Sequence, residues 1–389
     1  MKRILFIPAQ GFAHVTRTLR LAEAFKTDYD IQIILSQDFS FLADKLQIKF
    51  RLFDIGKIDY QQIIKGNFDS LSDEVKVAKE VALYEQAILD FQPDVIVTSA
   101  AVNATIAIKK HGITHVSITD SCNVEELKYG GNFNSEQIEM IKTEMMRSYN
   151  SVAEGFGVAT ANGLMDLMTG DFNVMPDLPY VFPLRERLPN FEFIGPLTWQ
   201  DSNGALDARI RIDRSKPLIY VSMGSSGKTE DMETLARILQ KSSYQAIMTT
   251  GGTADLEKLK QFERPGFYIE KFIAGDQIIR ASDKTIVVCH AGLGTVYQAF
   301  ENNTYGMITI PAHMQHDLIS KRLTALGMAR ELRGESINTL IEVCDDIISK
   351  PQAEGYAHVR EQIAFYQGPQ NGKAAIEKYL VSVPSSLSS

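Results

Sequence analysis

The sequence predicts an α/β protein of two doubly wound, Rossmann-like domains that face each other across a cleft. The chain has 389 residues, enough for two domains of roughly 150–200 residues each. Short β-branched runs alternate with helix-like segments in both halves, which is typical of parallel sheets covered by helices. A stretch with five prolines, residues 176–196, and the polar stretch after it separate the two halves.

The first half opens with a strand at 4–7, a turn, a helix to about residue 25 and a second strand at 31–35. This is a βαβ unit, the repeating element of a Rossmann-like domain. The other elements expected here are strands at 49–53, 95–98 and 113–118, helices at 71–91, 101–110 and 135–153, and an irregular loop at 121–134.

The second half repeats the alternation. The elements expected here are strands at 218–221, 245–249, 266–270, 285–288 and 307–310, and helices at 231–240, from 295, 318–326, 337–349, 357–366 and 373–380. We therefore expect a first domain over 1–196, a linker over 197–215 and a second domain over 216–365. Residues 366–389 are expected to form a helix that packs back on the first domain, followed by a flexible tail.

Composition limits the function classes. The net charge of −8 and the pI near 5.5 argue against a nucleic-acid-binding protein. The three cysteines, Cys122, Cys289 and Cys344, have neither metal-site nor disulfide spacing, which indicates a reducing, cytoplasmic location. No apolar stretch reaches about 18 residues, so no membrane span is expected, although a peripheral membrane contact stays open.

The most informative stretch is HAGLGT, which follows the buried strand at 285–288. A helix that begins after such a turn offers unpaired N–H groups and a positive dipole end to a phosphate. Gly292 and Gly294 let the backbone approach a ligand, Thr295 can cap the helix, and His290 can add a hydrogen bond or a charge. On pattern alone, a turn that merely connects strand to helix remains the alternative.

The longer pattern H-x-G-x-G-T, a helix, then G-x-x-x-x-P and a glutamine resembles the donor-binding signature of GT-B glycosyltransferases, in particular bacterial macrolide-type enzymes of glycosyltransferase family 1. The resemblance implies that His290 and the Gly-Thr turn hold a diphosphate. The family has an acidic residue eight places after this histidine for the ribose, where this chain has Gln298. Its acid–glutamine pair for the sugar reads Met314-Gln315 here.

The resemblance also assigns other donor-binding residues. The turn with Gly224, Ser225 and Ser226 corresponds to a family turn that contacts the diphosphate. Phe272 and Ile273 stand where the family packs the nucleobase. Together with Gln298 and Gln315, these residues complete the expected donor site.

His14 is the candidate catalytic base, in the segment that contains Gly11, Phe12 and Arg17 after the first strand. This segment resembles the family's N-terminal G-x-G-H, whose histidine removes the proton of the acceptor hydroxyl. A neutral imidazole suits that role near pH 7. A structural role for His14 is the alternative. We place Gly11, Phe12 and Arg17 at the acceptor, while Arg17 could instead steady the loop or be solvated.

The family orients this histidine with an aspartate, and Ser99 occupies that position here. A serine can orient an imidazole but cannot stabilise imidazolium as a carboxylate does. Three hypotheses stay open. The base acts without a carboxylate, Asp120 at the end of the next strand substitutes, or the activity is weak or absent.

The sequence thus predicts an inverting, metal-independent glycosyltransferase without a cofactor, which uses a UDP- or dTDP-linked sugar as co-substrate. The acceptor would be the hydroxyl of a small molecule, a lipid or a saccharide, and the oligomeric state is not predicted. The main alternative is a catalytically weak nucleotide-sugar-binding protein or partner subunit. A sugar-nucleotide epimerase and an NAD-dependent dehydrogenase fit less well, since the first turn lacks their motifs.

Overall fold

The computed structural model describes residues 1–53, 73–129, 135–200, 206–224, 228–251 and 254–382. The chain divides into two compact units. The first comprises Met1–Leu197 with Phe365–Ser389, and the second Thr198–Ala364. The predicted flexible tail falls largely on residues 383–389, which lie outside the described residues.

The first unit is built on a seven-stranded parallel sheet with strand order β3-β2-β1-β4-β5-β6-β7. Its strands are β1 (Arg3–Pro8), β2 (Asp30–Leu35), β3 (Phe50–Leu52), β4 (Val95–Ser99), β5 (Thr114–Ile118), β6 (Phe172–Met175) and β7 (Phe191–Phe193). The central strands are almost entirely buried, as expected for a parallel sheet covered on both faces.

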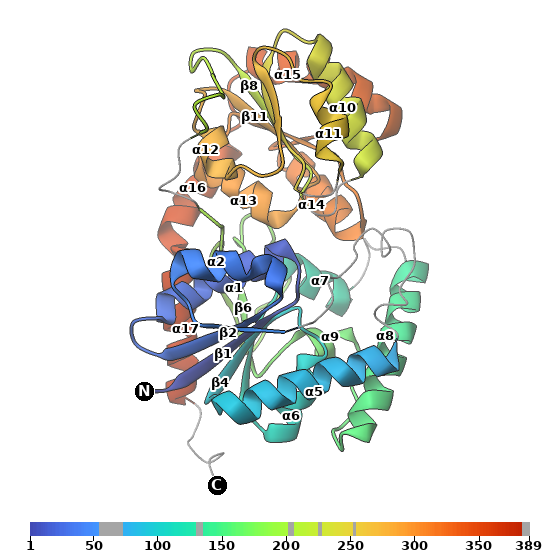
Figure 1. Ribbon diagram of the computed structural model, residues 1–389, viewed down its shortest axis with the longest axis vertical. Coiled ribbons are helices and arrows are strands. Elements are labelled where there is room, and N and C mark those ends of the chain that lie inside the picture. The colour runs from blue at the N-terminus through green and yellow to red at the C-terminus, as the bar shows by residue number, and fades with distance from the viewer. Residues whose placement is uncertain (54–72, 130–134, 201–205, 225–227, 252–253, 383–389) are drawn as a thin grey trace. The chain divides into compact units, whose positions relative to one another are not determined.

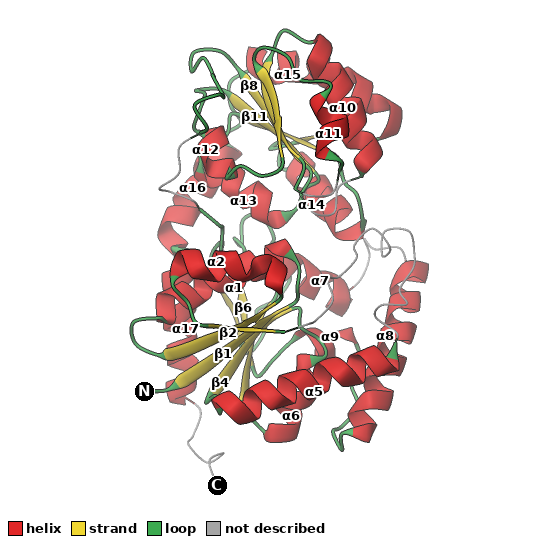
Figure 2. Ribbon diagram, in the orientation of Figure 1, coloured by secondary structure: helices red, strands yellow, loops and turns green. Residues whose placement is uncertain are grey.

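Helices cover both faces of this sheet. They are α1 (Phe12–Phe25), α2 (Ser40–Leu46), α5 (Glu74–Phe91), α6 (Ala104–His111), α7 (Ser121–Tyr129), α8 (Ser135–Gly155), α9 (Leu164–Met168) and α17 (Gly368–Ser382), with a 3-10 turn at Gln37–Phe39. Figure 2 shows α5 and α6 on one side of the sheet, and α1 and α2 on the other. None of the helices that the structure describes is long and apolar enough to cross a membrane.

The C-terminal helix α17 belongs to the first unit. The hydroxyl of Tyr29 donates to Glu377 at 3.0 Å, and the ring of Tyr379 stacks on Phe172 with 4.7 Å between centroids. The chain therefore returns to its first unit after completing the second, as Figure 1 shows by the red helix beside the blue strands.

Some elements differ from the sequence-based expectation. Residues 121–129 form α7 rather than an irregular loop, because the backbone N–H of Ser121 donates to Asp177, 56 positions away, at 2.6 Å. The short strands β6 and β7 lie in stretches where no strand was expected. Their pairing partners are distant in sequence, so local periodicity does not reveal them.

The second unit has a six-stranded parallel sheet with order β10-β9-β8-β11-β12-β13. The strands are β8 (Leu218–Ser222), β9 (Gln245–Thr249), β10 (Phe267–Glu270), β11 (Thr285–Cys289), β12 (Gly306–Thr309) and β13 (Arg330–Glu331). The helices are α10 (Thr229–Lys241), α11 (Leu256–Lys260), α12 (Gly275–Ile279), α13 (Leu293–Glu301), α14 (Met314–Ala325), η2 (Gly334–Thr339), α15 (Leu340–Ser349) and α16 (Gly355–Tyr366).

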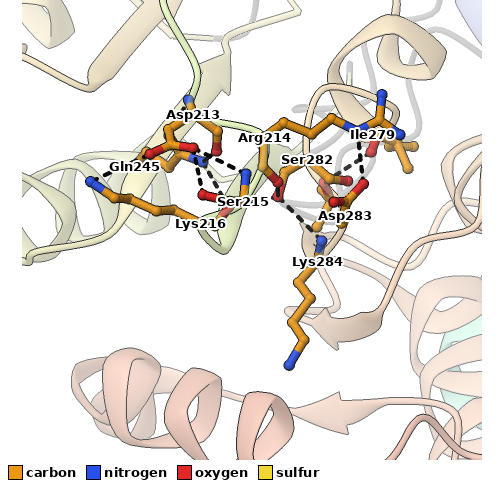
Figure 3. A network of polar contacts seen from close by, with 10 residues as sticks. Asp213, Arg214, Ser215, Lys216, Gln245, Ile279, Ser282, Asp283 and Lys284 are labelled. Carbon is orange, nitrogen blue, oxygen red and sulfur yellow. Dashed lines mark hydrogen bonds and ion pairs between the residues drawn. The ribbon is translucent and has the colours of Figure 1, made fainter.

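The last part of the predicted linker is fastened to the second unit by polar contacts (Figure 3). Arg214 pairs with Asp283 at 2.8 Å, and the Ser282 hydroxyl donates to the Lys216 carbonyl at 2.6 Å. The side chain of Gln245 also donates to the Asp213 carbonyl at 2.7 Å. These residues therefore move with the second sheet.

In each sheet the strand order reverses once. The reversal lies between β1 and β4 in the first unit and between β8 and β11 in the second. Ligands of doubly wound folds bind beyond the carboxyl ends of the strands at such a reversal. The two reversals therefore define where the site residues should be sought.

Candidate active site

His14 and Ser99 meet at the strand reversal of the first unit. Pro8, the last residue of β1, lies beside Ser99, the last residue of β4. His14 stands in the first turn of α1, and its Nδ1 lies 3.1 Å from the Ser99 hydroxyl. Gly11 is the N-cap of that helix and Phe12 its first residue, so both flank the histidine. The hydroxyl fixes the orientation of the imidazole, as the sequence predicted for a serine in this position.

The surroundings of His14 keep its ring neutral. Burial and the nearby charge of Arg17 lower the pKa of His14 to about 4, while the charge of Asp120 acts in the opposite direction. A neutral imidazole can accept a proton at pH 7. Without a carboxylate hydrogen bond on Nδ1, however, it is a weaker base than one held by aspartate.

Asp120 makes its strongest described contact with Arg17 rather than with His14. The guanidinium and the carboxylate are 2.5 Å apart, and both residues are buried. The prediction that Arg17 could be a solvated side chain is therefore wrong. Arg17 instead ties the first turns after β1 and β5 together, and Asp120 acts on His14 through its charge.

Asp177 completes this buried cluster, and the sequence analysis did not single it out. It follows β6 and accepts hydrogen bonds from the N–H and hydroxyl of Ser121, at 2.6 and 2.9 Å. Burial and the charge of Asp120 raise the pKa of Asp177 to about 6. No motif marks this residue. The only signal would have been its place after an apolar strand, and that strand was itself missed.

His290 occupies the corresponding place in the second unit, directly after β11. Glycines pack against its ring. A Cβ atom built on Gly224 would lie 2.5 Å from Cε1 of His290, and one on Gly292 would lie 2.4 Å from Nε2. These two glycines make room for the imidazole itself. Gly294 differs, since a Cβ there would meet no atom of the described residues within 4 Å beyond its own turn of helix.

The start of α13 has Gly292 as its N-cap and no side-chain cap among the described residues. The expectation that Thr295 caps it is wrong, because the helix begins at Leu293 and Thr295 lies within the first turn. Thr295 remains a candidate phosphate ligand, since the first turn of a helix offers N–H groups to an anion. Ser225 and Ser226, expected to contact the same phosphates, lie outside the described residues.

The remaining candidates for donor binding are Phe272, Ile273, Gln298 and Gln315. Phe272 and Ile273 follow β10, and the ring of Phe272 is 49% exposed, as a base-stacking residue must be before its ligand binds. Gln298, expected at the ribose, donates its amide to the Trp199 carbonyl at 2.8 Å. It therefore holds the start of the linker against α13. Gln315 stands in the first turn of α14.

Burial and the neighbouring His313 together lower the pKa of His290 to about 4, although a backbone hydrogen bond with Ser222 acts in the opposite direction. Among the described residues, no group of three or more His, Cys, Asp or Glu side chains is arranged to hold a metal ion.

Comparison with solved structures decides the fold. The glycotransferase of kitacinnamycin superposes with a TM-score of 0.80 at 16% identity, over 97% of this chain and 99% of that one. The spinosyn rhamnosyltransferase SpnG, complexed with thymidine diphosphate, gives 0.68 at 14% identity, over 97% and 100%. This chain has the GT-B fold. The fold and the resemblance predicted from the sequence are thus confirmed.

Curated relatives are more distant in sequence. A PGL/p-HBAD biosynthesis glycosyltransferase of Mycobacterium tuberculosis is 24% identical over 170 residues, which is 44% of this chain but only 38% of that protein. A PGL/p-HBAD biosynthesis rhamnosyltransferase of Mycobacterium bovis is 20% identical over 360 residues, 87% of this GT-B chain and 78% of the relative. No family model matches the chain. Both relatives are named as transferases of sugars, and the chain spans less than two-fifths of the length of the first.

Proposed function

We propose that this GT-B protein is an inverting, metal-independent glycosyltransferase that moves a sugar from a UDP- or dTDP-linked donor to an acceptor hydroxyl. The observation that carries the proposal is the pairing of His14 with Ser99 at the strand reversal of the first unit. When Nδ1–H of His14 donates to the serine, Nε2 is left as the proton acceptor. The acceptor oxygen, as it loses its proton to Nε2, attacks the anomeric carbon while the nucleoside diphosphate leaves.

The second unit supplies the donor-binding half of the reaction. The uncapped start of α13, the open face of Gly294 and the Thr295 hydroxyl suit a diphosphate, and the exposed ring of Phe272 suits a base. These groups also stabilise the negative charge that develops on the leaving diphosphate, which is why no metal is required.

The names of the similar proteins narrow the substrates. One spinosyn enzyme is a rhamnosyltransferase complexed with thymidine diphosphate, and another structure of it holds the spinosyn aglycone. The mycobacterial relatives include rhamnosyltransferases. A pyrimidine diphosphate linked to a hexose or deoxyhexose, and an acceptor with a hydroxyl on a largely apolar scaffold, therefore fit best.

Calorimetric titration with UDP, dTDP, GDP and NAD tests the donor half. We expect one pyrimidine diphosphate to bind and His290→Ala to weaken it at least tenfold, about 1.4 kcal/mol. The control His358→Ala, on the half-exposed surface of α16, should leave binding unchanged. If the wild-type protein binds none of the four ligands, the proposed function is wrong.

A second candidate is a nucleotide-sugar-binding protein with little turnover of its own. The low pKa of His14 and the serine in place of a carboxylate favour it. Donor consumption in the presence of an acceptor panel, followed by NMR of the anomeric proton of the product, separates the two candidates. An inverted anomer supports the transferase, and tight donor binding without turnover across the panel supports the binding protein.

A further inference from the structure

Three histidines of the second unit lie ring to ring beside the predicted diphosphate site. His290 follows β11, and His313 and His316 stand at the start of α14, which follows the neighbouring strand β12. The centroids of His313 and His316 are 3.5 Å apart, and those of His290 and His316 are 4.3 Å apart. We call these three residues the imidazole cluster.

The imidazole cluster contains buried nitrogens without a partner. Nδ1 of His290 and Nδ1 of His316 are inaccessible to solvent and have no hydrogen-bond partner among the described residues, and both residues are more than nine-tenths buried. The backbone of Ser222 lies close enough to the His290 ring to favour its protonated form, so His316 is the clearer of the two cases. Buried polar atoms in native proteins are normally satisfied, so two orphans in adjacent rings need an explanation. A site whose hydrogen bonds are completed when a ligand arrives is one such explanation.

Two helix N-termini flank the cluster. Gly292 precedes α13 and His313 is the N-cap of α14, and neither helix has a side-chain cap. Each helix start carries a partial positive charge, which favours an anion and disfavours an imidazolium ion. The orphan nitrogens are an independent sign that this position is built for a ligand rather than only for packing.

The charged groups around the cluster provide little negative charge to stabilise a protonated imidazole. Asp317 of α14 acts on His313, but its carboxylate pairs with Arg333 at 2.6 Å. Cys289 at the end of β11 stays a neutral thiol, because burial raises its pKa to about 12. Burial and mutual repulsion keep the rings neutral: the pKa of His290 and of His313 is lowered to about 4, and that of His316 also lies well below its usual value.

We propose that His290, His313 and His316 together take up a proton when the diphosphate of the donor binds, so that nucleotide binding is coupled to protonation of the imidazole cluster. The inference rests on the proposed function. A bound diphosphate places at least two negative charges beside the two helix starts. These charges favour the imidazolium form and so raise the pKa of the rings. By linkage, affinity for the nucleotide then falls as pH rises, by up to about tenfold per pH unit for one proton.

Calorimetry with UDP and dTDP, in buffers of different ionisation enthalpy between pH 6 and 8, measures the protons taken up. The test variant is His313→Gln, at a half-buried helix N-cap, with His316→Asn as a second variant. His358→Gln is the matched control on α16. The terminal phosphate of the nucleotide titrates near pH 6, and the difference between wild type and variant removes this contribution because the ligand is the same.

We expect the wild type and the control to take up about one proton more than His313→Gln, and the steep pH dependence of affinity to flatten in both test variants. Equal proton uptake by wild type and the folded variants, with nucleotide still bound, would overturn the inference and leave the proposed function standing. Absence of nucleotide binding by the wild type at every pH would overturn both.

Discussion

The two strand reversals, β1–β4 and β8–β11, share a backbone arrangement but differ in how their polar groups are satisfied. In each unit a histidine lies at the reversal, and an alanine with positive φ stands just beyond the strand, Ala100 one residue after the end of β4 and Ala291 two residues after the end of β11. In the first unit, ion pairs and hydrogen bonds within the protein join the site residues. In the second, the Nδ1 atoms of His290 and His316 have no hydrogen-bond partner among the described residues, whereas the helix starts at both reversals, α1 and α13, lack a side-chain cap.

This difference fits the two proposed roles, general-base catalysis in the first unit and phosphate binding in the second. A general base must be held in one orientation before the acceptor arrives, so its neighbours are bound to each other. A phosphate site must present donors that the ligand will use, so these stay unpaired until it binds. The comparison predicts that removing a charge impairs the first unit most. A larger side chain, or protonation of the histidines, should impair the second unit most.

The largest effect is expected for Asp120→Asn. It leaves the buried Arg17 guanidinium without its carboxylate, which should lower the free energy of unfolding by about 3–5 kcal/mol. The matched control is Asp317→Asn, whose pair with Arg333 is half exposed and should contribute less than about 1 kcal/mol. Urea unfolding of both variants measures the two losses, and equal losses would remove the contrast between the units.

Acid should destabilise the second unit before the first. The pKa of His290 and of His313 is about 4 in the folded protein, against about 6.5 when unfolded, so the unfolded state binds more protons between these values. Each such histidine removes stability as pH falls from 6.5 to 4, by at most about 3 kcal/mol. In the first unit, burial likewise lowers the pKa of His14 and His115 to about 4, but the raised pKa of Asp177, about 6, has the opposite sign and partly offsets them. The second unit has a third such histidine, His316, and therefore loses more stability.

The single tryptophan provides a test of which unit acid destabilises first. Trp199 is buried in the second unit, so its fluorescence reports that unit, while circular dichroism reports both. Thermal unfolding from pH 7 to 4 should show the fluorescence midpoint falling faster than the main circular-dichroism midpoint. Parallel shifts would argue against the difference in histidine burial as the cause.

Gly294→Ala should separate stability from donor binding. The added methyl meets no atom of the described residues within 4 Å beyond its own turn of helix and should stabilise α13 by about 0.5–1 kcal/mol. It also fills the space that a diphosphate needs, and losing one charge-assisted hydrogen bond should weaken nucleotide binding about 10–100-fold. Gly155→Ala at the end of α8, equally free of contacts, is the control. Unchanged affinity would place the diphosphate elsewhere.

Ser99→Asp should have the smallest effect, and it is a gain. A carboxylate at 3 Å from Nδ1, near the present 3.1 Å contact, would favour imidazolium and raise the pKa of His14. Turnover should rise about three- to tenfold and the acidic limb of the pH–rate profile should move to higher pH. Ser99→Ala, which removes the hydrogen bond, should lower turnover instead. If neither variant changes the profile, His14 is not the base.

Much of the fold follows from sequence because the central strands are uninterrupted apolar runs between turn residues, as in β1 and β11. The short strand β6 and the helix α7 do not, since β6 pairs with the distant β5 and the start of α7 is held by Asp177. Likewise, motif spacing brings His14 to Ser99 and identifies His290. It did not reveal that Gln298 holds Trp199, or that His316 stacks between His290 and His313.

The proposal that the first unit carries the catalytic base and the second binds the donor is tested most directly with two variants, His14→Ala and His290→Ala. Nucleotide affinity and turnover are measured for both. The account predicts that His14→Ala binds the nucleotide like wild type but loses about 10²–10⁴-fold in turnover. It predicts that His290→Ala loses nucleotide affinity first. Loss of nucleotide binding in His14→Ala, or full turnover in that variant, would contradict the account.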